Sequence, residues 1–289
     1  MLEHGGQLNQ AVQEYNIPAE DWLDLSTGIN PNGWVMTTPI PDSVWSQLPQ
    51  DDDDLVTTAQ QYYRSDSLLA VAGSQAAIQT LPSLRPHSRV GLLSPAYAEH
   101  AEAWQKMGHS VTELDPRLID KQIDRFDVLI IINPNNPTGD FFATQQLLRW
   151  HKNLASRGGW LIVDEAFIDV TPEKSLSSLC PQQGLIVLRS IGKFFGLAGL
   201  RVGFVLAESS VLIQLAEQLG PWPIAAASRF ITQHALADNE WQQRNRQQLI
   251  AQGEILHSLL EKSGLKPLFC SQRHKAVTMV LFPASEVVP

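Results

Sequence analysis

The sequence predicts an α/β fold, in which a mainly parallel sheet is flanked by helices within one large domain. Short runs rich in Val, Ile and Leu alternate with segments of helical periodicity along residues 68–207. Several of these runs, such as "DVLIIIN" at 127–133, are apolar almost throughout, which is typical of strands buried on both faces of a sheet. The 289 residues suffice for one large domain and part of a second.

The predicted strands and helices follow one another in a regular order. Strand-like runs lie at 68–72, 89–94, 127–133, 160–167, 184–191 and 201–207. Helical patterns lie at 74–84, where Pro82 limits the length, at 98–108, and at 144–159, where Thr144 is the expected N-cap. Right-handed crossovers between such strands bring their carboxyl ends to one edge of the sheet, where ligands bind.

After about residue 235 the pattern changes. A long amphipathic helix is expected at 239–264, and a strand-like run, "KAVTMVLFP", follows at 275–283. One strand after a long helix does not close a domain, so we expect a small, incomplete α+β C-terminal domain at 236–289. The expected large domain then covers 31–235, and residues 1–30 form an N-terminal arm that contributes to the substrate site.

Composition argues against several classes of function. A formal net charge of −9 provides no basic surface field for nucleic acid. No apolar run is long enough to cross a membrane, and the N-terminus has no apolar signal core. Cys180 and Cys270 cannot build a disulfide framework, which favours the reducing cytoplasm. The eight histidines, among them His100, lack metal-ligand spacing and are expected to be surface or core side chains.

The stretch "SIGKFFGLAGLRVG" at 190–203 contains the main candidate for chemistry. Lys193 lies among apolar and small residues, and desolvation lowers the pKa of a lysine, which frees its amine to form an imine with an aldehyde. Arg201 stays charged, and its planar guanidinium suits a phosphate. An aldehyde and a phosphate on one small molecule describe pyridoxal 5′-phosphate (PLP).

Two other segments can complete a PLP site. Asp164 ends a buried strand, where its carboxylate can keep the pyridine nitrogen protonated. Its neighbour Glu165 points to the opposite face of the strand and is expected to be structural. In "VAGSQAA" at 71–77, backbone N–H groups at a helix start can bind the phosphate, with Gly73 allowing close approach and Ser74 adding a hydroxyl.

Two further side chains can contact the cofactor ring. Tyr97 in "SPAYAEH" can stack on it, and Asn136 in "NPNNPTG" can donate to the 3′ oxygen. In this order, "NPNNPTG", "VDEAF" and "SIGKFFGLAGLRVG" resemble the motifs of fold-type I PLP-dependent enzymes. Within them, the sequence resembles the group of histidinol-phosphate aminotransferases and threonine-phosphate decarboxylases, from the N-terminus to the last residues.

The resemblance implies a role for each candidate. Lys193 would be the catalytic residue and would carry the cofactor. The cofactor-binding residues would be Gly73, Ser74, Gln75, Tyr97, Asn136, Asp164, Ser190, Lys193 and Arg201. The substrate-binding residues would be His4, Gly5, Gly28, Asn30 and Asn136, with the His4–Gly5 segment folding over the substrate. The resemblance also implies a homodimer that acts on a small phosphorylated amino acid.

Three features resemble the L-threonine O-3-phosphate decarboxylases of cobalamin biosynthesis. Phe167 stands where many aminotransferases have a tyrosine, "HGG" opens the chain, and "DLSTGINP" and "PWP" are similar to decarboxylase segments. The implied reaction yields (R)-1-amino-2-propanol O-2-phosphate and CO₂. Two alternatives stay open, namely an aminotransferase acting on histidinol phosphate or a related amino acid, and a truncated PLP-binding homologue without turnover.

Overall fold

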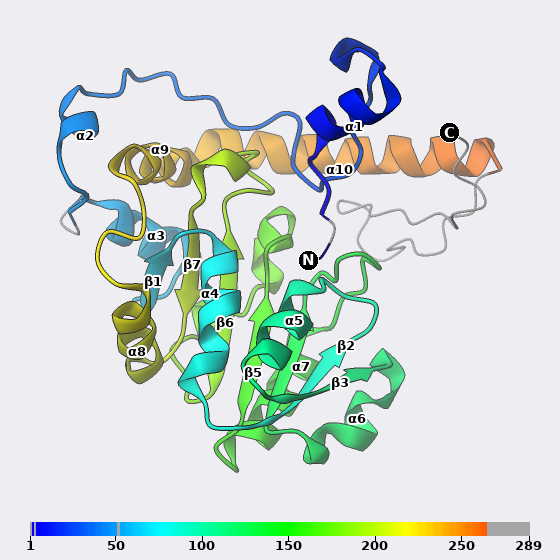
Figure 1. Cartoon of the computed structure of the whole chain (residues 1–289), viewed down its shortest axis with the longest axis vertical. Helices are drawn as coiled ribbons and strands as arrows, with labels where there is room; N and C mark the ends of the chain where they lie inside the picture. The colour runs from blue at the N-terminus through cyan, green and yellow to red at the C-terminus, as the bar shows by residue number, and fades with distance from the viewer. Residues whose placement is uncertain (1, 3, 51–52, 265–289) are drawn as a thin grey trace.

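The computed structural model describes residues 2, 4–50 and 53–264, and a seven-stranded sheet forms its centre (Figure 1). The strands are β1 (Leu68–Val71), β2 (Arg89–Leu93), β3 (Ser110–Leu114), β4 (Val128–Ile132), β5 (Trp160–Asp164), β6 (Leu185–Ser190) and β7 (Gly203–Leu206). Their order is β1-β7-β6-β5-β4-β2-β3. Strands β3, β2, β4, β5 and β6 pair in parallel, whereas β7 runs antiparallel to β6 and β1, so the prediction of a mainly parallel sheet is confirmed.

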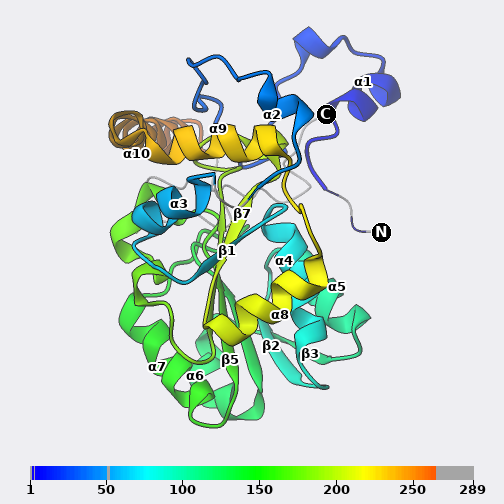
Figure 2. The ribbon, with the colours of Figure 1, turned by 90° about the vertical axis from the view of Figure 1, so that its left-hand side faces the viewer.

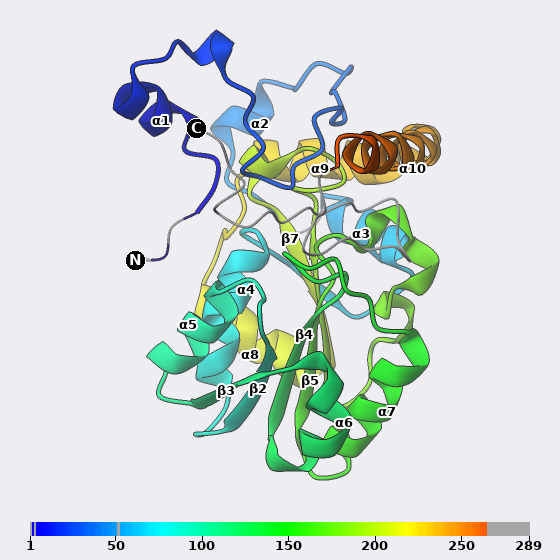
Figure 3. The same ribbon diagram turned by 90° about the vertical axis from the view of Figure 1, so that its right-hand side faces the viewer.

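Helices cover both faces of the sheet (Figure 3). One layer contains α4 (Ser74–Thr80), α5 (Glu99–Lys106) and α8 (Ser209–Leu219). The other contains α3 (Leu55–Tyr63), α6 (Ile119–Gln122) and α7 (Thr144–Ala155). Each layer buries its own hydrophobic cluster against the sheet, with Trp104 in the first and Trp150 in the second. Because both faces are covered, every residue of β4 and β5 is buried, which explains why these strands are apolar almost throughout.

The remaining helices lie at the end of the sheet where the parallel strands finish. Helices α9 (Ala226–Ala237) and α10 (Asn239–Lys262) cross it (Figure 1). The N-terminal segment, with α1 (Leu8–Tyr15) and α2 (Ser43–Ser46), runs over the same end (Figure 2). Short 3₁₀ helices occupy Ala19–Asp21, Leu81–Leu84, Pro116–Leu118, Ile123–Arg125, Ile168–Val170, Pro172–Lys174, Ser177–Leu179 and Ala198–Leu200.

The structure contains helices that were not predicted, among them α3, α8 and α9, and it differs from the sequence-based expectations in three further places. Thr144 is not the N-cap of α7; Ala143 holds that position, and the Thr144 hydroxyl donates to Lys174 O at 3.3 Å. Strand β3 was not predicted, because it lies at the edge of the sheet and most of its residues are exposed. The helix expected at 74–84 ends at Thr80 and continues as the 3₁₀ turn that contains Pro82.

The expected strand at 275–283, and with it residues 265–289 of the expected C-terminal domain, lies outside the described residues. Within the part of the chain that the structure describes, no helix combines the length and the hydropathy that crossing a membrane requires.

Candidate active site

A cavity of about 320 Å³ opens at the edge of the sheet where the parallel strands end. Asp164 is the last residue of β5, Ser190 is the last residue of β6, and Ser74 begins the helix that follows β1. Because these ends meet at one edge, side chains far apart in the sequence line one cavity. The lining consists of His4, Ser74, Gln75, Tyr97, Glu99, Ile132, Asn136, Asp164, Ala166, Phe167, Ser190, Gly192, Lys193, Ala198 and Arg201.

The cavity brings together every side chain that the sequence proposed for cofactor binding, and the backbone of Gly73 adjoins it. This convergence follows from the strand order rather than from any local motif. The particular contact assigned to each side chain stays a prediction.

Lys193 enters the cavity from the loop between β6 and β7. Its Nζ lies 5.4 Å from the centre of the Phe167 ring. Burial lowers the pKa of Lys193; the carboxylate of Asp164 opposes this shift, and the charge of Arg201 reinforces it. The Lys193 amine therefore loses its proton more readily than that of an exposed lysine, as expected for imine chemistry.

The loop that carries Lys193 is fixed by residues from distant parts of the chain. Asn30 N donates to Lys193 O at 3.1 Å, and Asn30 Nδ2 donates to Phe194 O at 2.9 Å. The Phe195 ring stacks on Trp241 of α10 with a centroid distance of 5.5 Å. Phe194 and Phe195 are thus buried in the core beneath the loop, while the Lys193 side chain faces the cavity.

Asp164 is a buried carboxylate, only 4% exposed, in the wall of the cavity. Its Oδ1 accepts a hydrogen bond from Ala166 N at 3.0 Å, and its Oδ2 lies 3.0 Å from Nε2 of His100. A buried carboxylate costs free energy unless it has partners, and these two contacts supply them. They also fix its orientation, and a carboxylate has lone pairs for a further donor.

Arg201 and Gly73 lie against each other in another part of the cavity. Gly73 has φ +73°, and a Cβ at this position would lie 2.8 Å from Nη2 of Arg201. A larger residue would therefore displace the guanidinium. The guanidinium and the hydroxyls of Ser74 and Ser190 form a polar end of the cavity whose chemistry suits a phosphate.

Four side chains form a chain of hydrogen bonds along one side of the cavity. The Tyr97 hydroxyl donates to Gln75 Oε1 at 3.2 Å, and Gln75 Nε2 donates to Glu99 Oε2. Glu99 Oε1 lies 2.7 Å from Nε2 of His4. Burial, together with the charges of Glu99 and Asp164, raises the pKa of Tyr97, so its hydroxyl keeps its proton and can donate.

Three residues proposed for substrate binding do not line the cavity. Gly5 packs against Ser26, where a Cβ would come within 2.0 Å of the Ser26 carbonyl oxygen, and Gly28 is exposed on the same turn. The Asn30 amide donates to the backbone of the lysine loop. The substrate contacts of Gly5, Gly28 and Asn30 stay predictions, and the structure places Asn30 beneath Lys193.

Two residues of the site were missed from the sequence. His100 was expected to be an ordinary surface or core side chain, yet it is buried against Asp164. The signal was its place three residues after Tyr97 at the start of a helix, a spacing that puts both rings on one face. Glu99 lies between them and carried no signal, because its role depends on a partner far away in the sequence.

The chemical groups that line this cavity fit PLP. It has an amine with a lowered pKa, a buried carboxylate, and a glycine and an arginine beside two hydroxyls, which match the aldehyde, ring nitrogen and phosphate of that cofactor. Within the described ranges, no group of three or more His, Cys, Asp or Glu side chains is placed so that it could hold a metal ion.

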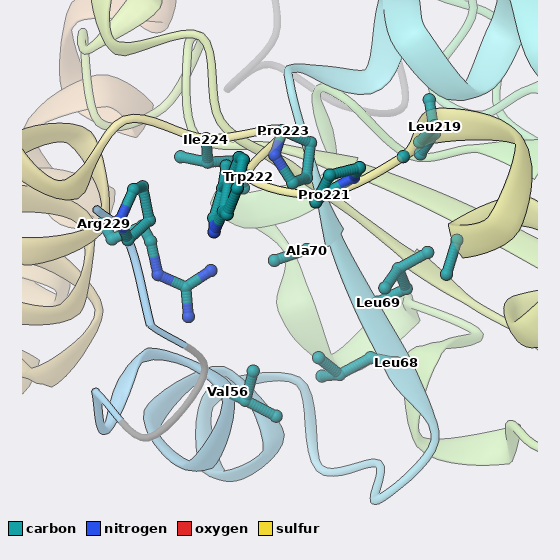
Figure 4. A pocket seen from close by; sticks show the side chains of 13 residues that line it. Val56, Leu68, Leu69, Ala70, Leu219, Pro221, Trp222, Pro223, Ile224 and Arg229 are labelled. Atoms are coloured by element: carbon teal, nitrogen blue, oxygen red, sulfur yellow. The ribbon is translucent and has the colours of Figure 1, made fainter.

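The "PWP" segment at 221–223 lies at a different hollow (Figure 4). This hollow of about 270 Å³ is formed by the residues that join α8 to α9, by the edge strand β1 and by Val56 of α3. Trp222 has φ 55° and is 58% exposed. The three residues therefore do not contribute to the cavity that contains Lys193.

Comparisons with known proteins identify the family of this chain. The family described as "Aminotransferase class I and II" matches residues 46–286. Threonine-phosphate decarboxylase of Pseudomonas aeruginosa is 52% identical over 92% of this chain and 80% of its own length.

Two solved structures share the fold. Histidinol-phosphate aminotransferase from Sinorhizobium meliloti, in complex with pyridoxal-5′-phosphate, has a TM-score of 0.67 at 16% identity, over 78% of this chain and 66% of that one. L-threonine-O-3-phosphate decarboxylase from Porphyromonas gingivalis has a TM-score of 0.59 at 19% identity, over 86% and 76%.

Proposed function

Because the chain belongs to the aminotransferase class I and II family, we propose that it is a PLP-dependent decarboxylase of L-threonine O-3-phosphate. The products are CO₂ and (R)-1-amino-2-propanol O-2-phosphate, as in the cobalamin pathway that the sequence resemblance implied. The observation that carries the proposal is the 52% identity, over 92% of this chain, to a threonine-phosphate decarboxylase. The contents of the cavity are consistent with it.

The cofactor is pyridoxal 5′-phosphate, which supplies an aldehyde for the substrate amine and a ring that accepts the electron pair left at Cα when CO₂ departs. Lys193 would hold the aldehyde covalently, and Asp164 would keep the ring nitrogen protonated. Arg201, Ser190 and Ser74 would bind the phosphate, with Gly73 leaving room for it. Tyr97, Gln75 and Asn136 would contact the ring and its 3′ oxygen.

A side chain of the protein would then transfer the proton that Cα needs after CO₂ has left. Once free, Lys193 in its ammonium form could deliver a proton to Cα of the substrate as a general acid and become a neutral amine. Burial lowers the pKa of Lys193 toward the operating pH, which suits a group that must both accept and release a proton. Phe167, close to Lys193 Nζ, has no hydroxyl, so it can pack against the lysine stem but cannot exchange a proton with it.

The second candidate function is amino transfer. Lys193 could equally remove a proton from Cα, and a histidinol-phosphate aminotransferase shares the fold. The two reactions differ in which bond of the substrate lies perpendicular to the ring, and that orientation depends on the groups that bind the substrate carboxylate.

The experiment is an assay of the PLP-loaded protein with L-threonine O-3-phosphate, with and without a 2-oxoacid. Release of CO₂ without the oxoacid supports the decarboxylase, whereas turnover that requires the oxoacid supports the aminotransferase. A visible band of bound cofactor without either activity supports a binding protein without turnover. Borohydride reduction followed by peptide mapping tests the attachment site; a pyridoxyl label on a lysine other than Lys193 contradicts the assignment.

We also infer a homodimer. Large apolar side chains are exposed along the N-terminal segment and near the hollow of Figure 4, and a second copy could cover them. They are Leu23, Leu25, Val35, Trp45, Leu48 and Trp222. Light scattering of the PLP-loaded protein tests this, and a monomeric mass at micromolar concentration contradicts it. A cytoplasmic location is the expectation from the two cysteines, of which Cys180 is a buried free thiol.

A further inference from the structure

The first part of the N-terminal arm, residues 4–16 and called the arm below, has few attachments to the rest of the described structure. Helix α1 has no buried residue. Gly6 N donates to Ser26 Oγ at 2.8 Å, which ties the arm to the exposed 24–28 turn rather than to the sheet or its helices. His4 makes the printed contacts that join these residues to the α/β body: its Nε2 lies 2.7 Å from Glu99 Oε1, and its ring lies 6.2 Å from the Tyr97 ring, centre to centre.

Glu99 is itself fixed from inside the cavity. Its second oxygen, Oε2, accepts from Gln75 Nε2, and Gln75 Oε1 accepts from the Tyr97 hydroxyl. The Glu99 side chain is 13% exposed, whereas the His4 side chain is 44% exposed. The Glu99 carboxylate is therefore held in one position by the cavity wall, and the more exposed His4 side chain binds to it.

A carboxylate in this position needs an explanation, because the proposed substrate is an anion. An unpaired Glu99 in the cavity lining would repel a phosphate. Here each of its oxygens is engaged, one by a neutral amide and one by an imidazole. The arrangement uses the carboxylate to hold the arm.

On the basis of the proposed function, we propose that Glu99 is a positioning residue that latches the N-terminal arm across the cavity through His4. The latch keeps the arm in place over the bound phosphorylated amino acid. Tyr97 and Gln75, which line the cavity, hold the Glu99 carboxylate in place through their hydrogen bonds. Loss of the latch should weaken substrate binding, because the arm must then be ordered each time a substrate binds.

The first test is a double-mutant cycle with Glu99→Gln and His4→Gln. Each single variant should raise KM for L-threonine O-3-phosphate about tenfold, which corresponds to about 1.4 kcal/mol, with kcat within about twofold of the parent. The double variant should be no worse than either single variant, because both remove one contact. Additive losses in the double variant would overturn the proposal.

Glu102→Gln is the matched control. Glu102 lies in the same first turn of α5 and is exposed, so the control removes the same charge from the same helix end. It should leave KM within about twofold of the parent. An equal rise in KM for Glu102→Gln would mean that net charge, rather than the latch, accounts for the effect.

The second test does not depend on turnover. Hydrogen exchange of residues 4–16 in the PLP-loaded protein should accelerate about fivefold to tenfold in Glu99→Gln and His4→Gln, and should not change in Glu102→Gln. Unchanged exchange in both latch variants overturns the proposal. If the parent enzyme fails to decarboxylate threonine phosphate but the arm still exchanges faster in the latch variants, the proposed function has failed and the latch stands.

Discussion

Asp164 and Glu165 are adjacent carboxylates at the end of β5, and their side chains lie on opposite faces of the sheet in different surroundings. Asp164 lines the cavity beside His100. Glu165 is fully buried on the other face, where its Oε1 accepts from Leu176 N at 2.8 Å. Alternation along a strand separates them. The same functional group, one residue apart, therefore lines the cavity on one face and belongs to a buried network on the other.

The face behind the cavity contains a buried ionic network within its hydrophobic cluster. Glu165 and Asp169 both contact the guanidinium of Arg189, which is 2% exposed. The Tyr62 hydroxyl donates to Asp169 Oδ1 at 2.8 Å. Burial, reinforced by Asp169, holds the pKa of Tyr62 well above its usual value, so it remains a donor. Buried charges of this kind need every partner, which makes this face sensitive to substitution.

The largest expected effect is on activity, from Asp164→Ala. Without the carboxylate, the ring nitrogen loses the group proposed to keep it protonated. We expect kcat/KM for threonine phosphate to fall at least about a thousandfold, or about 4 kcal/mol of transition-state stabilisation. The melting temperature should shift by only a few degrees. If Asp164→Ala lost activity only because the protein unfolds, Asp164 would be a structural residue like Glu165, and the contrast between the two carboxylates would be wrong.

The next effect is on stability, from Glu165→Ala. This change leaves Arg189 buried with one carboxylate fewer, and we expect the free energy of unfolding to fall by about 3 kcal/mol. Urea denaturation at a fixed, saturating PLP concentration measures it. The folded enzyme at low temperature should keep kcat within about threefold of the parent. Glu165→Gln is the milder control, since an amide can still accept from Leu176 N.

His100→Phe should have an intermediate effect on activity. It removes the hydrogen bond to Asp164 Oδ2 but leaves the carboxylate in place. We expect kcat to fall about tenfold, or about 1.4 kcal/mol, and the absorbance of bound cofactor to change its pH dependence. If the loss equalled that of Asp164→Ala, His100 would itself contact the reacting groups.

The smallest effect concerns a carboxylate at the opposite end of the sheet. Asp127, just before β4, pairs with Arg89, and hydrogen bonds from Arg89 are the main cause of a pKa of about 2 for Asp127. Because this folded-state pKa is below the unfolded value, the pair stabilises the protein above about pH 4 and loses its effect as the pH falls toward 2. Asp127→Asn should cost about 0.5 to 1 kcal/mol at pH 7. Denaturation curves from pH 7 to 2 should converge with those of the parent, and kcat should not change.

How much of the structure can be predicted from the sequence depends on how far apart along the chain the interacting residues lie. Strands β4 and β5 were predictable because each is buried on both faces, so every position is apolar or small until the last. The candidate site was predictable because its polar residues follow strand ends, and the topology gathers those ends. Strand β3 was not, since only Leu114 in it is buried.

The missed parts of the site depend on how elements turn toward one another. His100 contacts Asp164 only because α5 turns that face toward β5, and Glu99 meets His4 only because the arm returns over the cavity. The spacing of Tyr97 and His100 places both rings on one face, but no local pattern specifies which way that face turns or where the arm returns. The same reason explains Asn30, whose predicted substrate contact stays untested and whose amide supports the lysine loop instead.

The loop that carries Lys193 has a consequence for how the protein matures. Its backbone carbonyl groups accept hydrogen bonds from Asn30 and Trp34, near one end of the chain. Its Phe195 ring stacks on Trp241, far along the chain toward the other end. Contacts separated by so many residues close late during folding. The amine therefore acquires its reactivity only once both segments have docked. Uptake of the coloured cofactor can therefore report that assembly is finished.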